Sequence, residues 1–315
     1  MKPLTVHSQQ NRLGLEMRLN SHTSTGPTIL FIASIFFGSS AIFVRYATEA
    51  SAISLTFFRL SLATVGMILF ALSTHSLRRL SRRNLLLVLL SGAVLSFHFA
   101  TFILAVKTTT VANATFLVNT SPIMLAVIAP LIIMERTTIR EALAVIIAML
   151  GVLLVAHAGN GFGAFGLGDL SALLAAFFVA IYALIGRYLR TSGVNTACYT
   201  SYVYGTATLV SVAMLAFPDT LPFRAYDLQN LLAILGLGIV PTMLGHTLYN
   251  YALGSVKAVR ANLFPLIEPI IASLLAVVLF GEVPTIVQDG GYFLILIAVV
   301  IVATTETTIK LIPVE

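Results

Sequence analysis

The chain has 315 residues, of which 58% are hydrophobic and only 10% are Asp, Glu, Lys or Arg. Because a soluble domain averages about 45–50% apolar and about 25% charged residues, this composition excludes a soluble enzyme of ordinary class. A membrane-spanning helix needs roughly 20 mainly apolar residues, so the chain has room for about ten spans with short connections. The single cysteine, Cys198, excludes an internal disulfide bond and a cysteine-based metal cluster. The fold class that we predict is an all-α integral membrane protein.

The chain begins with a polar segment, residues 1–26, which lacks the apolar core of a cleavable signal peptide and is predicted to be a flexible cytoplasmic tail. Ten apolar stretches follow, at residues 28–47, 54–72, 84–106, 109–133, 139–157, 169–189, 195–217, 229–252, 259–280 and 290–309. They are continuous runs rather than short alternating segments, which favours helices over a β-barrel. A Gly-rich linker is predicted at residues 158–168 and a short C-terminal tail at residues 310–315.

The distribution of positive charge predicts the topology. If the N-terminus is cytoplasmic, 14 of the 18 Lys and Arg residues fall in cytoplasmic segments. Arg45, Lys107 and Arg224 fall on the other side, and Arg59 lies within a span. By the positive-inside rule, this pattern predicts ten transmembrane helices with both termini cytoplasmic. Because the basic residues form no stripe interleaved with aromatic residues, we expect no nucleic-acid partner despite the net charge of +6.

An internal repeat divides the chain into two halves. Ala114-Thr115-Phe116-Leu117, Pro122 and Glu135 recur 147 residues later as Ala261-Asn262-Leu263-Phe264, Pro269 and Glu282. The repeat predicts two units of five helices, residues 27–157 and 169–309. Since five crossings are an odd number, the second unit must enter the membrane from the opposite side. Inverted repeats of this kind are typical of secondary transporters, which bind their substrate between the halves near the membrane midplane.

Short motifs resemble those of a known family in their order across both halves. The first span carries Phe36-Phe37-Gly38-Ser39, the second Phe57-Phe58-Arg59-Leu60, and the sixth Ala175-Ala176-Phe177-Phe178-Val179-Ala180-Ile181-Tyr182. With the paired prolines and glutamates of the repeat, they resemble the drug/metabolite transporter superfamily in its ten-helix EamA branch, over nearly everything after residue 26. The resemblance implies a transporter, commonly an exporter, of amino acids or related metabolites, similar to the aromatic amino-acid exporters of bacterial inner membranes. Phe37 stands where many relatives have Trp, which weakens a substrate inference through that position.

Ionisable residues inside spans are candidates for function because their burial in lipid is costly. Arg59 could anchor a substrate carboxylate, or it could be a structural cation that pairs with carbonyl groups or with Glu268. Glu268 lies between Pro265 and Pro269, which remove backbone donors and leave carbonyl groups free to line a cavity. Its carboxyl group could bind an ammonium group or carry a proton, or it could satisfy the freed backbone as a neutral group.

Two matched helix faces complete the predicted substrate site. His98, Thr101 and Phe102 share one face of the third span, and His246, Tyr249 and Asn250 share one face of the eighth. We expect these faces to form opposite walls of one cavity, although a membrane histidine can also be a packing residue. Three further candidates come from their positions in the first, fourth and sixth spans: Phe36, Asn119 and Tyr182. Glu135 and Glu282, which end the fourth and ninth spans, are each expected to pair with a nearby cation or with a following helix start, because the helix dipole disfavours a carboxylate there.

The hypothesis that follows is a secondary transporter, not an enzyme, with a small-molecule substrate and the lipid bilayer as its partners and with no cofactor or metal. A channel-like or facilitated-diffusion pore and a non-transporting receptor or scaffold are the alternatives. Gly166-Leu167-Gly168-Asp169 and Tyr226-Asp227 also match motifs of aspartyl intramembrane proteases, but both aspartates lie in or beside loops and in reversed order. The almost purely aliphatic fifth and tenth spans are predicted to face lipid or to form a homodimer.

Overall fold

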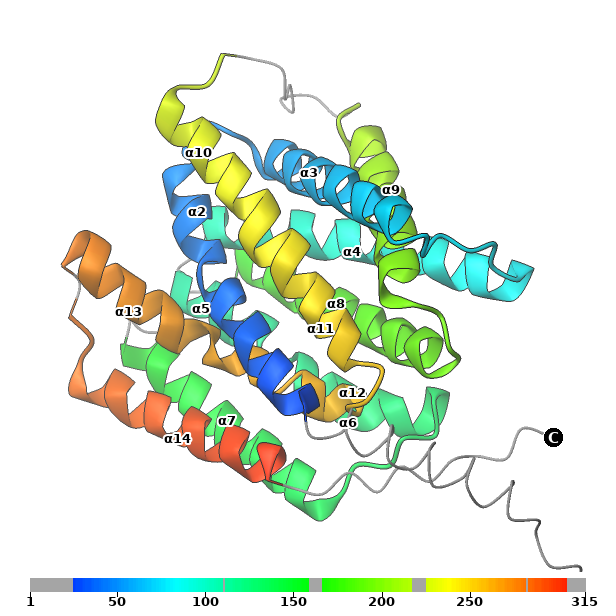
Figure 1. Cartoon of the computed structure of the whole chain (residues 1–315). Coiled ribbons are helices and arrows are strands. Elements are labelled where there is room, and N and C mark those ends of the chain that lie inside the picture. Colours follow the sequence, from blue (N-terminus) through cyan, green and yellow to red (C-terminus); the bar gives the residue numbers. More distant parts are fainter. Residues whose placement is uncertain (1–24, 110, 159–165, 217–224, 282, 305–315) are drawn as a thin grey trace, which may run out of the picture.

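The computed structural model describes residues 25–109, 111–158, 166–216, 225–281 and 283–304, and every regular element in these segments is helical (Figure 1). Among these residues, eight helices are long and apolar enough to cross a membrane, and Phe116–Ile132 is a shorter apolar helix. The prediction of an all-helical membrane fold is therefore confirmed. The predicted C-terminal tail, residues 1–24 of the predicted N-terminal tail and most of the predicted linker lie outside the described residues.

Each of the ten predicted stretches overlaps a helical segment among the described residues, and residues 305–309 of the tenth stretch lie outside them. The first is a helix over residues 25–38 that continues as α2. The elements after it are α2 (Ser40–Tyr46), α3 (Ala52–Ser73), α4 (Arg82–Thr108), α5 (Val111–Val118), α6 (Ser121–Ile132), α7 (Ile139–Ala158), α8 (Leu167–Thr191), α9 (Thr196–Met214), α10 (Leu228–Leu237), η1 (Gly238–His246), α11 (Thr247–Ala252), α12 (Ala258–Ala261), η2 (Phe264–Ile267), α13 (Glu268–Phe280) and α14 (Ile286–Ala303).

The fourth and ninth stretches are broken at positions that are 147 residues apart. The fourth stops at Val118 and resumes as α6 at Ser121, and the ninth passes through the 3₁₀ turn η2 before α13 begins at Glu268. Pro122 and Pro269 occupy the first turn of the resumed helix in each case, where the missing N–H costs no helical hydrogen bond. The chain therefore interrupts both spans in the middle of the bundle.

Two helix starts are also equivalent. Thr138 and Glu141 exchange backbone and side-chain hydrogen bonds at the start of α7, as Thr285 and Gln288 do at the start of α14. In such a capping box each side chain satisfies a backbone N–H that the helix leaves without a partner. These two boxes are again 147 residues apart in the sequence.

The helices pack in pairs (Figure 1), and exchanging the first half of the chain for the second gives the same set of pairs. The second span, α3, packs against the seventh, α9, and the fifth, α7, packs against the tenth, α14. The third span, α4, packs against the sixth, α8, while the first, through α2, packs against the eighth, through α10. When each span is replaced by its counterpart in the other half, the pairs α3–α9 and α7–α14 each give themselves again. The pairs α4–α8 and α2–α10 are converted into each other.

The pair α7–α14 is held at close range by glycine. A Cβ atom built on Gly291 would lie 2.6 Å from the carbonyl oxygen of Gly151, and the reverse distance is also 2.6 Å. The two helices therefore contact each other within one chain. Side chains on their outer faces, such as Ile146 and Phe293, are exposed. The homodimer predicted through these spans stays a prediction that would use those outer faces.

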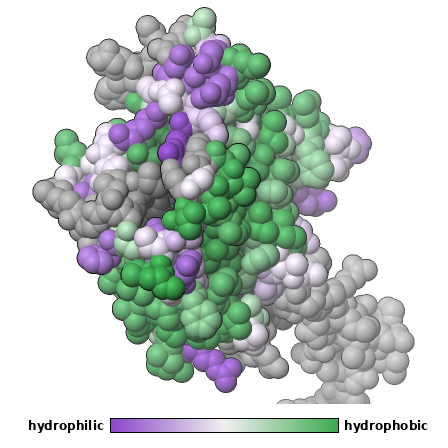
Figure 2. Space-filling model, turned by 90° about the vertical axis from the view of Figure 1, so that its left-hand side faces the viewer, coloured by the Kyte–Doolittle hydropathy of each residue, from purple (hydrophilic) through white to green (hydrophobic). Residues whose placement is uncertain are grey.

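The bundle has two different ends. We call the end where the described chain begins at Thr25 and finishes at Thr304 the terminal end, and the opposite one the distal end (Figure 1). A cavity of about 720 Å³ lies between α2, α7, α13 and α14 on the distal side, with Arg45, Lys107 and Gln288 among its lining residues. Figure 2 shows hydrophilic residues gathered about a hollow, flanked by broad apolar surface.

The close contact predicts unequal effects for two neighbouring glycines. We expect Gly291→Ala to lower the stability of the detergent-solubilised protein by about 1–3 kcal/mol, because the new methyl group overlaps the α7 backbone. Gly290→Ala is the matched control, since no described atom lies within 4 Å of its Cβ position. It should leave the melting temperature unchanged or raise it through better helix propensity. Equal melting temperatures for the two variants would contradict this packing.

Candidate functional site

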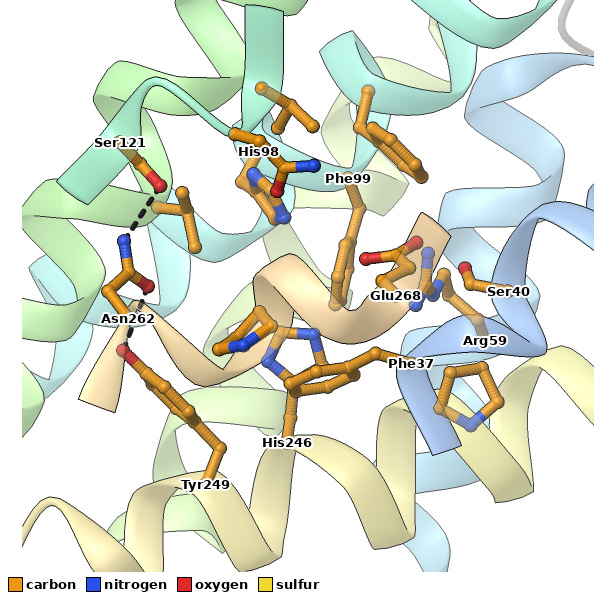
Figure 3. Close-up of a pocket in the computed structure, with 16 residues that line it drawn as sticks. Phe37, Ser40, Arg59, His98, Phe99, Ser121, His246, Tyr249, Asn262 and Glu268 are labelled. Carbon is orange, nitrogen blue, oxygen red and sulfur yellow. Dashed lines mark hydrogen bonds between the residues drawn. The ribbon is translucent and has the colours of Figure 1, made fainter. Parts of the chain in front are cut away.

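A second cavity, of about 70 Å³, lies at the centre of the bundle where the broken spans meet (Figure 3). It can hold several water molecules. The lining residues come from both halves of the chain: Phe37, Ser40, Arg59, His98, Phe99, Phe102, Val118, Asn119, Ser121, Val179, Pro241, His246, Tyr249, Asn262, Pro265 and Glu268. We call it the central cavity.

Arg59 places a guanidinium group in this cavity with only 2% of the residue exposed. Its Nε donates a hydrogen bond of 2.9 Å to Thr242 Oγ1, and its Cζ lies 3.6 Å from the centre of the Phe99 ring. The position of Thr242 follows from Pro241, which has no N–H to donate to the Leu237 carbonyl. Thr242 donates its hydroxyl to that carbonyl instead, at 2.7 Å, and thereby turns its lone pairs to Arg59.

Glu268 stands opposite Arg59 at the break in the ninth span. It is the first residue of α13, and its carboxylate points towards the guanidinium group (Figure 3). Opposite charges this deep in an apolar bundle attract each other strongly, because little solvent screens them. Glu268 also lines the large distal cavity, so the two cavities meet at its side chain.

The two predicted histidines lie in one aromatic cluster, with 6.5 Å between their ring centroids. The ring of His246 packs against Phe37 at 4.7 Å, Phe99 at 4.9 Å and Tyr182 at 5.9 Å. His98 Nδ1 lies 2.9 Å from the Ala175 carbonyl oxygen. Since that oxygen can only accept, Nδ1 must carry the hydrogen.

Three polar atoms that line the central cavity are buried without a hydrogen-bond partner among the described residues. They are Nη1 of Arg59, Nδ2 of Asn119 and Nδ1 of His246. A buried polar group without a partner costs about 1–3 kcal/mol, so native proteins rarely keep several of them in one place without a ligand or water. The cluster therefore marks the cavity as a place for water molecules or for a polar ligand.

A chain of hydrogen bonds closes the cavity towards the terminal end. Tyr249 Oη donates to Asn262 Oδ1 at 3.1 Å, and Asn262 Nδ2 donates to Ser121 Oγ at 2.7 Å (Figure 3). These hydrogen bonds connect the eighth, ninth and fourth spans, and therefore the two halves, on the terminal side of Arg59 and Glu268.

The structure brings together most of the predicted site residues. The central cavity is lined by Arg59, His98, Phe102, Asn119, His246, Tyr249 and Glu268.

Four predicted residues do not line the cavity. Thr101 is half-buried and donates to the Phe97 carbonyl at 2.7 Å, because the inward face of α4 runs through Phe99. Asn250 and Tyr182 hydrogen-bond each other beside the cavity. Phe36 is half-buried, while its neighbour Phe37 lines the cavity.

Several residues that line the central cavity were not predicted from the sequence. Phe99, Ser121 and Asn262 are examples, and only the repeat carried a signal for the last two. Ser121 is the repeat counterpart of Glu268, and Asn262 belongs to the repeated Ala261-Asn262-Leu263-Phe264 motif. Phe99 follows His98 directly, and no periodicity distinguished it from the other aromatic residues of this span.

Other acidic residues have structural partners. Glu135 Oε1 accepts from Arg187 Nε at 2.6 Å, which confirms the prediction that Glu135 pairs with a cation, whereas Glu282 lies outside the described residues. Asp169 accepts from the Gly166 N–H and Asp227 from the Asn230 N–H, so both aspartates of the protease alternative cap helices.

The hydrogen-bond chain predicts a graded loss of stability. Asn262→Ala removes both bonds and leaves Tyr249 Oη and Ser121 Oγ without partners, so we expect a loss of about 2–5 kcal/mol, on the basis of the cost of unsatisfied buried groups. Ser121→Ala removes one bond and should cost about half as much. Thermal unfolding in detergent measures both. A Ser121→Ala protein less stable than Asn262→Ala would show that the bonds are not the cause.

Comparisons with known proteins agree with this architecture. The model of the EamA-like transporter family matches twice, at residues 24–157 and 166–304. An uncharacterized transporter, YdfC, of Bacillus subtilis is 30% identical over 82% of this chain and 83% of its own. An uncharacterized transporter of Archaeoglobus fulgidus is 28% identical over 88% of this chain and 95% of its own. A crystal structure with 19% identity has the same fold, with a TM-score of 0.74 over 89% of this chain and 96% of that chain. The chain therefore belongs to the EamA-like transporter family and is a multi-pass membrane protein.

Proposed function

We propose that this chain is a secondary transporter, and specifically an exporter, of a small solute that carries both a carboxylate and an ammonium group, such as an amino acid. The observation that carries the proposal is the central cavity, where a buried cation and a carboxylate face each other beside unpaired donors. A zwitterionic solute matches this arrangement group by group.

The fit of such a solute follows from the donors and acceptors. Its carboxylate would accept from Nη1 of Arg59 and Nδ2 of Asn119, two of the three unpartnered polar atoms of the cavity. Its ammonium group would donate to Glu268. The rings of Phe37, Phe99 and Phe102 would contact its apolar part and keep water away from the charged groups. Charge-assisted hydrogen bonds of this kind are about twice as strong as neutral ones.

The proposed topology has ten spans in two inverted halves in the inner (plasma) membrane, with the terminal end cytoplasmic. The positive-inside distribution supports the orientation. The two separate family matches, the equivalent helix breaks and the exchangeable helix pairs support the two halves. In this topology the distal cavity is open to the outside, and the hydrogen-bond chain through Asn262 lies on the cytoplasmic side of the substrate.

Alternating access is the mechanism that this arrangement favours. The large cavity reaches Glu268 from the distal side, whereas hydrogen bonds and ion pairs join the halves at the terminal end. A carrier would exchange which end is open by rocking one half against the other. A channel or facilitated-diffusion pore would need both ends open at once.

Counterflow in proteoliposomes tests the proposal. Vesicles loaded with one amino acid at high concentration should accumulate the labelled amino acid transiently if the protein is a carrier, and the rate should saturate. A channel gives linear flux without accumulation. The absence of flux for every member of an amino-acid panel would contradict the proposal. In a separate measurement, an imposed pH gradient distinguishes proton-coupled transport from facilitated diffusion.

The role of Glu268 gives a residue-specific prediction. We expect Glu268→Gln to lower the initial counterflow rate by about tenfold or more, because the neutral amide cannot pair with an ammonium group or carry a proton. Asp289→Asn is the matched control, since it removes a carboxylate that is exposed at the start of α14. Its rate should stay within about twofold of the parent, as for an exposed charge. An unchanged rate in Glu268→Gln would contradict the assigned role.

A further inference from the structure

The terminal end of the bundle is closed by charged contacts between the halves. Glu141, which is 1% exposed, lies 3.5 Å from Lys257 Nζ and 3.4 Å from Arg260 Nε through its Oε1 atom. Its other oxygen accepts from the Thr138 N–H at 2.7 Å, so the carboxylate serves the helix cap and the ion pairs together. Glu141 belongs to the first half and both cations to the second.

Further contacts lie beside this group and cross between the halves in the same way. Glu135 accepts from Arg187 Nε at 2.6 Å and from the Ala258 N–H at 3.1 Å. Lys257 also donates to the Arg136 carbonyl at 3.2 Å. The fourth and fifth spans of one half are thereby fastened to the sixth and ninth spans of the other.

The repeat supplies an internal comparison for Glu141. Its counterpart 147 residues later is Gln288, which makes the same capping box with Thr285 at the distal end. Gln288 carries no charge and lines the large distal cavity. The counterparts of Lys257 and Arg260 in the sequence are the neutral residues Thr110 and Asn113. The two ends therefore share a backbone design but differ in charge.

Taking the proposed transport cycle as given, we propose that Glu141, Lys257 and Arg260 form an ionic latch that closes the cytoplasmic end and makes the outward-open state the resting state. A symmetric pair of gates would leave the two states nearly equal in free energy. The latch supplies the difference, because its ion pairs exist only while the terminal end is closed. Opening that end would separate Glu141 from both cations. In an exporter the empty carrier makes this step when it returns to load, and solute that binds from the cytoplasm then shifts the population towards the inward-open state.

Glu141→Gln is the variant that the repeat itself suggests. Because Gln288 makes the same cap, the substitution should keep the start of α7 intact and remove only the charge. Lys257→Gln is a second variant with a milder effect on folding, since the Lys257 side chain is 25% exposed. Arg140→Gln is the matched control, because Arg140 is exposed at the same helix start and its loss changes the charge of this end by one unit.

Accessibility of a reporter thiol measures the resting state. Ser40, which lines the central cavity, is replaced by cysteine in the full chain carrying Cys198→Ser. Right-side-out and inside-out membrane vesicles are then treated with a membrane-impermeant maleimide without solute, and the ratio of the two labelling rates is determined. We expect labelling to be faster from the outside, and Glu141→Gln to lower the outside-to-inside ratio by about tenfold or more.

The controls decide between the outcomes. Lys257→Gln should lower the ratio less than Glu141→Gln, and Arg140→Gln should leave it within about twofold of the parent. An unchanged ratio in both latch variants overturns the latch, as does a parent that is labelled equally from both sides. Counterflow is measured on the same proteins. Absence of flux for every solute with the shift in ratio intact overturns the transport function and leaves the latch in place.

Discussion

The burial of the Arg59 guanidinium group in an apolar helical bundle is the constraint on which the centre of the structure depends. A charge there is tolerated only where polar and aromatic groups replace the water that it has lost. Thr242, the Phe99 ring and the Glu268 carboxylate provide this environment from three other spans. Each of these spans must hold its side chain at the depth of Arg59, so the charge determines the relative positions of the second, third, eighth and ninth spans.

The irregular backbone follows from the same requirement. The α-helix stops before Asn119 in the fourth span, widens to the π-helix Gly238–His246 around Pro241 in the eighth, and tightens to a 3₁₀ turn at Pro265 in the ninth. Asn119, Pro241 and Pro265 all line the central cavity. Backbone groups that lack helical partners are tolerated within a membrane only where they are covered by protein or meet a polar cavity. The breaks and the cavity therefore depend on each other, and the prolines keep the breaks at this depth.

The two halves share a backbone plan while differing in chemistry. Ser121 occupies the position in the first half that Glu268 occupies in the second, and Glu141 corresponds in the same way to Gln288. The first difference makes the central cavity electrically polar, with a carboxylate on one wall only. The second places ion pairs at one end of the bundle and a neutral cap at the other. A repeat thus supplies a similar backbone in both halves, and single side chains make the two ends of the bundle chemically different.

The class of the protein, the apolar stretches, the internal repeat, the disturbed backbone at Pro265 and Pro269 and the isolation of Arg59 and Glu268 all follow from the sequence alone. These features depend on composition, on proline and on the cost of charge in lipid, all of which act locally along the chain. Which aromatic or polar residue of a span lines the cavity became clear only from the folded chain, as with Phe37 rather than Phe36 in the first span and Phe99 rather than Thr101 in the third. Successive residues of a helix differ in direction by about 100°, and in nearly uniformly apolar spans no periodicity fixes the rotation. The rotation is set by packing against the partner helices. The hydrogen bonds of Asn262 and the ion pairs of Glu141 depend on the same packing, because they join segments far apart in the sequence.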